Sequence, residues 1–572
     1  MARSFDMSRR SFLTGAAAVA SLSAVGAISS CAPKGEAASQ NAKDMHRASD
    51  APSWLGEAPE ISDADCVDIL DFEVVIVGAG TSGYFAAASA AENGAKTLLI
   101  EKSSAGNGIR SSALGAVNSK AQKERGISID IPDIVNNLSS YAQGRADTRL
   151  IRKWAENSGE AIDWYTDLLA QNGMEVQLEW SMPEGTRYLE WPIGHGTNGE
   201  YPAREGEVSK IFDAYITSFD GCEERFSTVM RRLIADESGR VIGLYAEGPD
   251  GMIRVNASKG VVIATGGYAY DKAMYMDRHA EEYASHGTFD AFPSCTGDGI
   301  KSLLWLGSSM DSIPSGVVFN RCLLTAEQHE GDPYNVGIKE YGYFFYSSQP
   351  FLRVDHSGQR FHNESEPYEY VMKTSANRPK GNRFWHQIWD TNWKTDIDRF
   401  HTTGCSTICY HEGGDHDSFP TMVEDWIEPE MESFVEAGYI VKADTLEELG
   451  KALEITDMDA FLATCKRQNE NFDNQVDPDF GKEAFRLSEL RTPPFYATVK
   501  SCGFSLCTTD GIKVDDDLRP YGEDDHAIEG VRVVGNDQGG FYGGVYPNLA
   551  VGLNAGRCAT FGRLAGKALA QA

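Results

Sequence analysis

The stretch DFEVVIVGAGTSGYFAAASAAENGAKTLLIEK, residues 71–102, decides the fold of this chain. It opens with an apolar run rich in valine and isoleucine, Phe72–Val77, which has the composition of a buried β-strand. The glycine-rich turn Gly78–Gly83 follows, then the helix-forming segment Tyr84–Asn93 and a second apolar run, Thr97–Ile100. Strand, glycine turn, helix and strand in this order predict one βαβ unit of a parallel sheet.

Four residues of this unit fit the pyrophosphate and ribose of a dinucleotide. Gly78 permits the tight turn, Gly80 lets the backbone approach a pyrophosphate, and Gly83 lets helix and strand pack closely. The N-terminus of the helix offers free N–H groups to the phosphates. Glu101, at the end of the second strand, is placed to hold ribose hydroxyls. An ordinary glycine turn would not need this acid, so we favour a dinucleotide site.

The N-terminus resembles a bacterial export signal. Ser8–Leu13 contains a twin-arginine pattern, and Ala16–Ile28 is a mild apolar segment too short to span a membrane. Ile28–Cys31 resembles a lipobox, in which Cys31 becomes the lipidated first residue. Cleavage near Ala38 without lipidation is the alternative, and a plain basic tail is a third. We expect export of the folded protein by the twin-arginine (Tat) route, to the outer face of the cytoplasmic membrane, the periplasm or the cell surface.

Length, charge and cysteine content exclude several classes. The 572 residues can form two or three domains, and the net charge of -32 argues against binding to nucleic acid or to anionic lipid by charge. Eleven cysteines spread over this length are no disulfide framework, and the chain has no Cys-x-x-Cys-His haem motif. Cys405, Cys409, Cys502 and Cys507 could hold an iron–sulfur cluster, but we favour ordinary buried thiols. His195 and the other histidines lack the spacing of metal ligands, so no metal site is predicted.

Further strand and turn signals recur along the chain. The pair Gly239–Ala246 and Met252–Ala257 is typical of a hairpin, and it leads into a strand that ends at the turn Ala264–Gly267. An aromatic-rich middle section follows. Val531–Asp537 then forms another strand and turn before a C-terminal helix over Gly552–Ala570. This order predicts a cofactor domain interrupted by an inserted cap.

Five motifs in this order resemble those of the flavoprotein subunits of fumarate reductases and succinate dehydrogenases, a family that includes urocanate reductases and 3-ketosteroid Δ1-dehydrogenases. They are Gly78–Gly83 with Glu101, Ala264–Gly267, Thr296–Gly299, Gly358–Glu364 and Gly562–Gly566. The resemblance covers about residues 70–570. It implies an α/β plus α+β fold, in which a Rossmann-like FAD-binding domain is interrupted by a capping domain.

The resemblance divides the chain into five parts. These are a signal at 1–31, a flexible tether at 32–65, the first part of the FAD domain at 66–310, the cap at 311–490 and the second part of the FAD domain at 491–572. The FAD contacts that it implies are Gly78, Gly80, Ser82, Gly83, Glu101, Asn107, Ser111, Ser112, Gly115, Thr265, Gly266, Asp298 and Asp537. The FAD is expected to be non-covalent, because Ser111–Val117 lacks the histidine that tethers flavin in succinate dehydrogenases.

The chain departs from the fumarate-type members where they clamp a dicarboxylate. Met310–Leu323 has no His-Pro-Thr, and Ser365–Tyr368 has no arginine. Cys507–Gly511 replaces His-Thr-Met-Gly-Gly, and Tyr546–Asn548 replaces Asn-Arg. With the clamp absent at four places, the chain resembles the ketosteroid dehydrogenase branch, whose members carry tyrosines at the positions of Tyr368 and Tyr546.

These tyrosines suit a neutral substrate, because a phenol is protonated at neutral pH and, unlike arginine, does not demand an anion. We assign Tyr368 to proton transfer at carbon, and Tyr546 with the backbone N–H near Ala550 to a carbonyl oxygen. The alternative is that both tyrosines are packed residues of the cap and the core, with no role in catalysis. If the assignment fails, Arg353 or Arg378 is the first arginine to test.

The predicted function is FAD-dependent reduction of an activated C=C bond in an enone or unsaturated lactone. A separate cytochrome or quinol-linked membrane protein would supply the electrons. The alternatives are a 3-ketosteroid-type dehydrogenase, a fumarate-like or urocanate-like carboxylate reductase, and a non-catalytic flavin electron carrier. A carrier needs no substrate lid, so the large cap disfavours the last of these.

Overall fold

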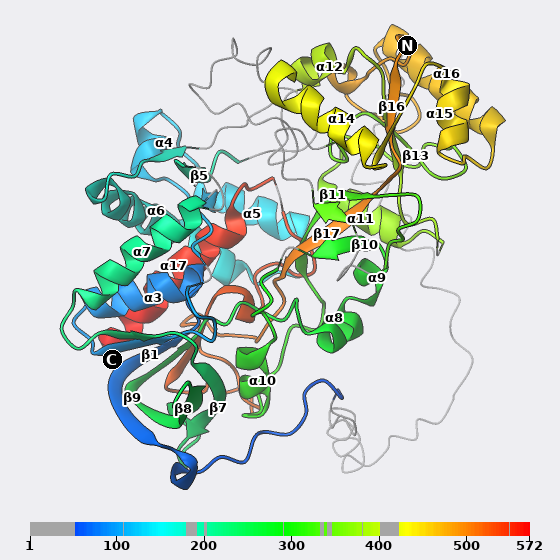
Figure 1. Cartoon of the computed structure of the whole chain (residues 1–572). Helices are drawn as coiled ribbons and strands as arrows, with labels where there is room; N and C mark the ends of the chain where they lie inside the picture. The colour runs from blue at the N-terminus through cyan, green and yellow to red at the C-terminus, as the bar shows by residue number, and fades with distance from the viewer. Residues whose placement is uncertain are drawn as a thin grey trace, which may run out of the picture. The chain divides into compact units, whose positions relative to one another are not determined.

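A largely parallel sheet forms around the predicted βαβ unit in the computed structural model (Figure 1). Strand β1 (Asp68–Val77) pairs in parallel with β2 (Thr97–Ile100) on one side and with β9 (Gly251–Ile263) on the other. Strand β6 (Glu223–Arg225) continues the sheet beyond β2, and β18 (Val531–Val533) pairs in parallel with β9. All four residues of β2 are buried, as expected for a parallel strand covered on both faces.

An antiparallel extension completes this sheet. Strand β8 (Val241–Gly248) forms the predicted hairpin with the first half of β9, and β7 (Val229–Ala235) pairs with β8. The second half of β9 runs on between β1 and β18 and delivers the chain to the turn at Ala264. The long strand therefore places the second glycine turn beside the first.

Two helices cross one another closely on this sheet, because small residues line their contact. Helix α3 (Thr81–Glu92) follows the first glycine turn, and α17 (Leu553–Ala570) is the predicted C-terminal helix. A Cβ on Gly562 would lie 2.4 Å from the carbonyl oxygen of Ser82, so only glycine permits this approach. Helices α6 (Thr148–Gln171) and α7 (Ala203–Thr217) pack beside this pair through Tyr165 and Phe212, which surround Phe85.

A small three-stranded sheet lies at the N-terminal end of α17. It consists of β4 (Val176–Leu178), β5 (Gly194–Thr197) and β3 (Leu114–Gly115), with β5 in the middle. A Cβ on Gly115 would come within 2.9 Å of the backbone of Gly552, so this glycine lets β3 pack against the start of α17. The loop that carries β3 is thereby fixed against the last helix.

Two four-stranded sheets build the predicted cap. The first has the order β10 (His286–Phe289), β17 (Lys500–Thr508), β11 (Gly316–Leu324) and β12 (Ile338–Lys339). The second has the order β13 (Leu352–Val354), β14 (His386–Trp389), β16 (Phe495–Thr498) and β15 (Ile440–Ala443). Strands β16 and β17 are almost continuous, so one chain segment joins both sheets.

The remaining helices complete both parts. In the cofactor domain and at the crossing to the cap they are α4 (Lys120–Glu124), α5 (Ile131–Tyr141), α8 (Lys272–Arg278), α9 (Ala280–Tyr283) and α10 (Asp298–Leu304). In the cap they are α11 (Tyr368–Ala376), α12 (Trp393–Phe400), α14 (Glu428–Glu436), α15 (Leu446–Ala452) and α16 (Met458–Asn474). Short 3₁₀ or π turns occupy Asp63–Asp65, Val423–Ile427, Ala484–Arg486 and Gly535–Asp537.

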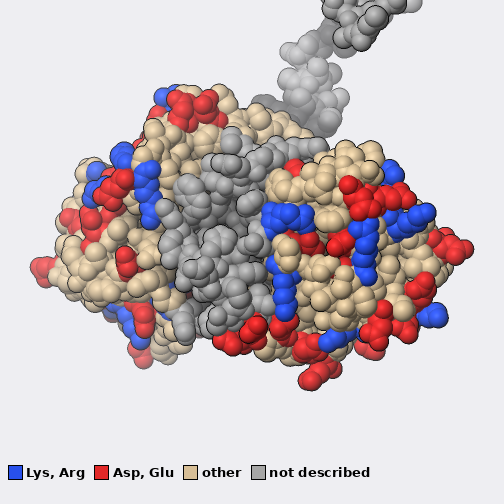
Figure 2. Space-filling model, turned by 90° about the horizontal axis from the view of Figure 1, so that it is seen from above, with Lys and Arg blue, Asp and Glu red and all other residues tan. Residues whose placement is uncertain are grey.

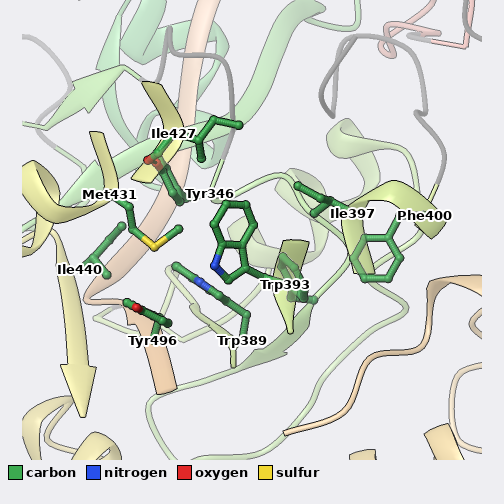
Figure 3. Close-up of a cluster of buried hydrophobic side chains, with 10 residues drawn as sticks. Tyr346, Trp389, Trp393, Ile397, Phe400, Ile427, Met431, Ile440 and Tyr496 are labelled. Atoms are coloured by element: carbon green, nitrogen blue, oxygen red, sulfur yellow. Dashed lines mark hydrogen bonds between the residues drawn. The ribbon is translucent and has the colours of Figure 1, made fainter. Parts of the chain in front are cut away.

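The cap has its own aromatic core, which explains the aromatic-rich middle of the sequence. Trp389 and Trp393 lie in it beside Tyr346 and Tyr496 (Figure 3). Phe351 belongs to the same cluster, with its ring centroid 6.0 Å from that of Trp389. The rings of Trp389 and Tyr496 are stacked, with centroids 5.9 Å apart and an interplanar angle of 8°. This cluster belongs to the cap alone and does not line the cavity described below.

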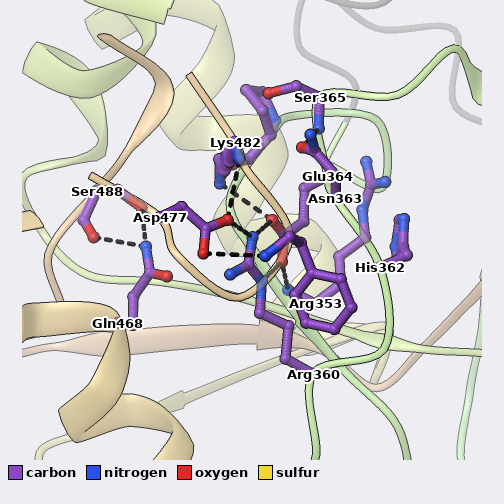
Figure 4. A network of polar contacts seen from close by, with 12 residues as sticks. Arg353, Arg360, His362, Asn363, Glu364, Ser365, Gln468, Asp477, Lys482 and Ser488 are labelled. Carbon is purple, nitrogen blue, oxygen red and sulfur yellow. Dashed lines mark hydrogen bonds and ion pairs between the residues drawn. The ribbon is translucent and has the colours of Figure 1, made fainter. Parts of the chain in front are cut away.

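The motif Gly358–Glu364 serves a buried charge cluster in the cap (Figure 4). Arg360 donates two hydrogen bonds to Glu364, at 2.8 and 2.7 Å, and one to Asp477 at 2.8 Å. Burial alone would raise the pKa of Glu364, but Arg360 and Lys482 hold it well below its usual range. The motif that helped to identify the family thus stabilises the cap rather than contacting a ligand directly.

The structure describes residues 52–106, 108–111, 113–178, 191–199, 203–289, 291–331, 337–339, 346–379, 381–400, 423–547 and 549–572. Residues 57–572 form one unit, and no helix in the part so described is long and apolar enough to cross a membrane. The predicted α/β plus α+β fold is confirmed. The predicted domain limits at 310 and 490 stay a prediction. Strand β17, outside those limits, pairs with β10, also outside them, and with β11, which lies within them.

Candidate active site

One cavity of about 490 Å³ joins the glycine turn to the cap. The cofactor domain contributes the ends of β1 and β2, the start of α3 and the start of α17. The cap contributes residues of β10, β11, β17 and α11. Of the predicted site residues, the cavity wall contains Gly78, Gly80, Ser82, Glu101, Thr265, Gly266, Asp298, Tyr368 and Tyr546.

The glycine turn has the space that a pyrophosphate needs. A Cβ on Gly83 would lie 1.7 Å from the carbonyl oxygen of Gly78, so Gly83 is required for the helix to start here. Gly78 has φ +106°, a conformation that favours glycine. Gly80 has no neighbouring atom within 4 Å of the position its Cβ would take, and it lines the cavity. The open side of Gly80 and the N-terminus of α3 therefore fit the phosphates of FAD.

Glu101 stands at the end of β2, as predicted, and is 4% exposed. Its Oε2 accepts a hydrogen bond of 2.8 Å from the N–H of Ala79, and its Oε1 accepts one of 2.8 Å from Ser103. The carboxylate is thus held against the glycine turn while it faces the cavity. Next to it, Lys102 pairs with Asp298 at 2.7 Å, and both of these side chains also line the cavity.

Asp537 shapes the second turn from behind the wall. It is fully buried, and its carboxylate accepts hydrogen bonds from the N–H groups of Thr265, Gly266 and Gly267 and, at 2.9 Å, from the Thr265 hydroxyl. Burial raises the pKa of Asp537 to about 6, while these donors oppose the rise. Asp537 therefore braces the turn whose residues Thr265 and Gly266 line the cavity, and its own contact with FAD stays a prediction.

The other predicted FAD contacts lie beside the cavity or outside the described residues. Gly83 and Gly115 serve close packing, and the hydroxyl of Ser111 accepts a hydrogen bond of 3.1 Å from Arg204. Asn107 and Ser112 fall outside the residues that the structure describes. Of the described residues in the loop after β2, the cavity wall contains Lys102, Gly108, Arg110 and Ala113.

The two predicted catalytic tyrosines meet in the same cavity although 178 positions separate them in the sequence. Tyr368 is the first residue of α11, is 4% exposed and packs on Phe319 with ring centroids 4.7 Å apart. Tyr546 is 6% exposed, and its hydroxyl oxygen accepts a hydrogen bond of 3.3 Å from the N–H of Asn554. Both tyrosines thus line the wall of one cavity.

The backbone N–H near Tyr546 has a different role from the one expected. The N–H of Ala550 donates a hydrogen bond of 3.0 Å to the carbonyl oxygen of Pro547, which closes a turn before α17. The Ala550 N–H thus serves this turn. The nearest backbone donor with a contact to the tyrosine is that of Asn554, in the first turn of α17.

Asn554 is a site residue that the sequence analysis missed. Its side chain donates to the Asn536 side-chain oxygen at 2.9 Å and to the sulfur of Cys507 at 3.5 Å. Its side-chain oxygen accepts from Tyr542 at 3.1 Å and from Arg557 at 3.0 Å. An asparagine at the start of a helix is too common a signal to reveal this network.

Arg110 is a second missed residue. It lines the cavity, and its backbone N–H donates a hydrogen bond of 3.0 Å to the hydroxyl of Thr81 at the start of α3. Its position between the predicted contacts Asn107 and Ser111 was a signal that could have identified it. The fallback residues Arg353 and Arg378 lie elsewhere: Arg353 is buried against Gln387 at 2.8 Å, and Arg378 pairs with Asp355 at 2.5 Å.

The two ends of the cavity differ in character. The charged residues of its wall all belong to the cofactor domain: Glu101, Lys102, Arg110, Glu205 and Asp298. The cap side is formed by apolar and aromatic side chains with the Tyr368 hydroxyl among them: Phe289, Val317, Phe319, Tyr368 and Leu506. This division fits a charged cofactor at one end and a neutral, largely apolar substrate at the other.

A buried polar network stands where the chain departs from the His-Thr-Met-Gly-Gly motif. Asp510 is fully buried and is bound by Tyr268 at 2.7 Å, by Arg278 at 2.6 Å and by His279 at 3.2 Å. His279 also contacts Glu282 at 2.8 Å. Burial alone would lower the pKa of His279, but the two carboxylates raise it to about 9. The network joins the segment that enters the cap, which carries Tyr268 and His279, to the segment that leaves it, which carries Asp510.

Among the described residues, the cysteines considered for an iron–sulfur cluster do not come together. Cys405 and Cys409 lie outside the described residues. Cys502 is buried opposite Cys322 in the cap sheet, whereas Cys507 lines the cavity. Within the described ranges no group of three histidine, cysteine or acidic residues is placed to hold a metal ion.

Comparison with known proteins agrees with this geometry. A family model described as an FAD binding domain matches residues 73–553. Vinyl phenol reductase of Lactiplantibacillus plantarum is 26% identical over 517 residues, which cover 87% of this chain and 96% of that protein. Digoxin reductase of Eggerthella lenta is 25% identical over 579 residues, which cover 96% of each chain.

A solved structure shares the fold. The 3-ketosteroid-Δ4-(5α)-dehydrogenase of Rhodococcus jostii, solved with 4-androstene-3,17-dione, superposes with a TM-score of 0.66 at 18% identity. The similarity covers 90% of this chain and 99% of that one. At this identity the likeness shows the common architecture of a cofactor domain with an inserted cap.

Proposed function

This chain belongs to the FAD binding domain family, and from that premise we propose that it reduces an activated C=C bond of a neutral small molecule at the cap end of its cavity. The observation that carries the proposal is the pair Tyr368 and Tyr546, which face one apolar space. When bound in its reduced form, FAD would supply a hydride, that is, the two electrons and one of the two hydrogens that such a reduction consumes.

The chain's own residues then bind the carbonyl oxygen of the substrate and supply the proton that its carbon accepts. Tyr546 lines the cavity and carries an O–H donor, so it donates a hydrogen bond to the carbonyl oxygen of the bound substrate. Tyr368 donates a proton to the substrate carbon next to the carbonyl. Phe319 holds the ring of Tyr368, and the buried start of α11 excludes water from the cap side. Both roles need a protonated phenol and no charge.

The relatives support this class of reaction. Vinyl phenol reductase and digoxin reductase are both named as reductases, and each matches this chain along nearly its whole length. The shared fold with a ketosteroid dehydrogenase keeps the reverse reaction, desaturation of a saturated ketone, as the alternative direction. The same two tyrosines would serve it with the proton transfers reversed.

Arg110 favours one second candidate, a conjugated carboxylate. It is the arginine of the described cavity wall, and an arginine binds a carboxylate better than a phenol does. Its contact with Thr81 places its backbone at the glycine-turn end, away from the tyrosines. We therefore assign Arg110 to the cofactor end and keep fumarate-like substrates as the competing outcome.

We also propose export and a separate electron donor. The twin-arginine pattern at Arg9 and Arg10 and the lipobox cysteine Cys31 support anchoring outside the cytoplasmic membrane; these residues lie outside the described part of the chain. Figure 2 shows acidic side chains in groups along the edge of one face, with lysines and arginines between them. The net charge of -32 suits a basic redox partner.

A substrate panel tests the proposed function. The purified holoprotein is mixed anaerobically with reduced methyl viologen and with neutral enones, unsaturated lactones, vinyl phenols, fumarate and urocanate. We expect viologen oxidation with one or more neutral compounds and none with the two carboxylates. Tyr368→Phe should lower kcat by about 10²-fold, the usual scale for a lost general acid, while FAD stays bound. Rapid fumarate reduction that Arg110→Met abolishes would replace this proposal with the carboxylate candidate.

A further inference from the structure

Arg557 lies fully buried one layer behind the wall of the cavity. It is the fifth residue of α17 and is 0% exposed. Its guanidinium donates hydrogen bonds to the carbonyl oxygen of Gly535 at 2.8 Å, to the side-chain oxygen of Asn554 at 3.0 Å and to the carbonyl oxygen of Gln538 at 3.3 Å. All of these acceptors are neutral.

No carboxylate within the described residues lies in ion-pair distance of Arg557, and its Nε has no hydrogen-bond partner there. The neighbouring carboxylate of Asp537 is engaged by the Thr265–Gly267 turn. Arg563, six residues further along the same helix, does have a partner, Glu92 at 3.0 Å. A buried cation without a counter-charge is costly, and the first turns of a helix make it more so, because the helix dipole is positive there. The rings of Phe541 and Tyr542 face the guanidinium, with centroids 5.5 and 5.1 Å from its carbon, but no carboxylate of the described residues neutralises its charge.

A negatively charged partner of Arg557 can bind in the cavity. Three of the residues that surround the guanidinium, Gly535, Asn536 and Asn554, also line the cavity. The charge of Arg557 reaches the wall, since it opposes the rise in the pKa of Cys507, which burial brings to about 12. A negative group in this part of the cavity would complete the ion pair.

The position along the cavity identifies the negative group. The ribose and pyrophosphate of FAD fit Glu101 and the α3 N-terminus. Gly535 lies beside Ser82 at this N-terminus, and from there the cavity wall continues to Gly552 at the start of α17, so the flavin ring extends along the wall in front of Arg557. Reduction of the ring by two electrons and one proton leaves one negative charge on it. We propose that Arg557 is the counter-ion of the reduced flavin ring, and that it raises the reduction potential of the bound FAD through the α17 N-terminus and Asn554.

The experiment is potentiometry of the purified holoprotein with an indicator dye and a xanthine/xanthine oxidase reducing system. Arg557→Gln removes the charge and keeps hydrogen-bonding atoms, Arg557→Lys keeps the charge, and Arg563→Gln is the matched control on the same helix. We expect Arg557→Gln to weaken binding of reduced relative to oxidised FAD by at least about tenfold, a fall of about 30 mV for a two-electron couple. Arg557→Lys should lower the reduction potential less, and Arg563→Gln should leave the reduction potential unchanged.

Sulfite gives an independent readout, because it adds to oxidised flavin and places a negative charge on the ring. Its dissociation constant, measured by the loss of flavin absorbance, should rise at least tenfold in Arg557→Gln and less than threefold in Arg563→Gln. Unchanged potential and sulfite affinity in Arg557→Gln would overturn the proposal. So would equal loss of oxidised and reduced FAD, which would identify Arg557 as a partner of the phosphates.

The wild-type protein supplies a test that does not depend on how the variants fold. If the reduced ring is an anion at neutral pH, the potential falls between pH 6 and 8 with the slope of one proton per two electrons. A slope of two protons per two electrons would show a neutral reduced ring and would refute the role of Arg557. Neither measurement uses a substrate, so the result stands apart from the substrate panel.

Discussion

Tyr546→Phe is the most informative single substitution in this site. It keeps the ring, which lies 5.5 Å from that of Tyr542, and removes only the hydroxyl that accepts from Asn554 at 3.3 Å. The carbonyl oxygen of the substrate loses its proposed donor. Loss of one such donor lowers kcat by about 10²-fold to 10³-fold, which corresponds to about 2.7–4 kcal/mol of transition-state stabilisation.

The effect on stability should be much smaller. The N–H of Asn554 loses its acceptor, and an unsatisfied buried donor costs about 1–3 kcal/mol. Because this N–H borders the cavity, water can replace the phenol oxygen, and we expect a cost near the lower limit of about 1 kcal/mol. The variant should therefore fold and bind FAD.

Tyr542→Phe is the matched control. Tyr542 is fully buried, lies four residues earlier and donates a hydrogen bond of 3.1 Å to the same asparagine, but it does not line the cavity. Its loss should cost a similar amount of stability and change kcat by less than about threefold. The assay is steady-state reduction of the best neutral substrate from the panel, with thermal unfolding and FAD content measured on each variant. Equal kcat losses in Tyr542→Phe and Tyr546→Phe, or full activity in Tyr546→Phe, would refute the assignment.

Four further predictions test other parts of the reasoning. Gly80→Ala should fold like the wild type but bind FAD at least about tenfold more weakly, measured by fluorescence titration of the apoprotein, because its methyl group would enter the phosphate space; Gly206→Ala, equally free of neighbours, should bind normally. Acid precipitation should release all flavin into the supernatant, and colour in the pellet would contradict non-covalent binding. The pKa of His279 is about 9 when folded against an ordinary 6.5, so the stability that its positive charge contributes is complete below pH 6.5 and is lost as the pH rises through 9. The difference in melting temperature between wild type and His279→Gln should therefore shrink between pH 6.5 and pH 10, and a difference that does not depend on pH would contradict this pKa. Replacing Arg9 and Arg10 by lysine should leave active protein in the cytoplasm of a fractionated bacterium, and normal export of that variant would exclude the twin-arginine route.

The local elements of the cofactor domain were predictable from the sequence. Phe72–Val77 and Thr97–Ile100 proved to be the central strands, and the final helix begins at Leu553, one residue from the predicted start. These elements follow from short-range patterns: apolar runs, a glycine turn with fixed spacing and a helix after it. The family motifs extended the prediction to the cap, because their order along the chain is specific.

The contacts of single residues were less predictable. Asp537, predicted only as an FAD contact, also braces the Thr265 turn, and the N–H of Ala550 is used within its own turn. Asn554 and Arg557 gave no signal. A sequence names the residue types, but the partner that a buried polar group finds depends on how distant segments pack.

The sequence by itself determined that this chain is a flavoprotein with a mixed α/β fold, and it predicted two tyrosines in place of a carboxylate clamp. Only the tertiary structure decided that Tyr368 and Tyr546 face one apolar space, and that a cation without a carboxylate partner in the described chain lies behind it. The physical reason is the sequence distance over which each kind of interaction acts. Strand, turn and helix propensities act over a few residues, whereas the cavity is formed by β11, β17, α11 and α17, whose alignment is fixed by packing across almost 240 positions of the chain.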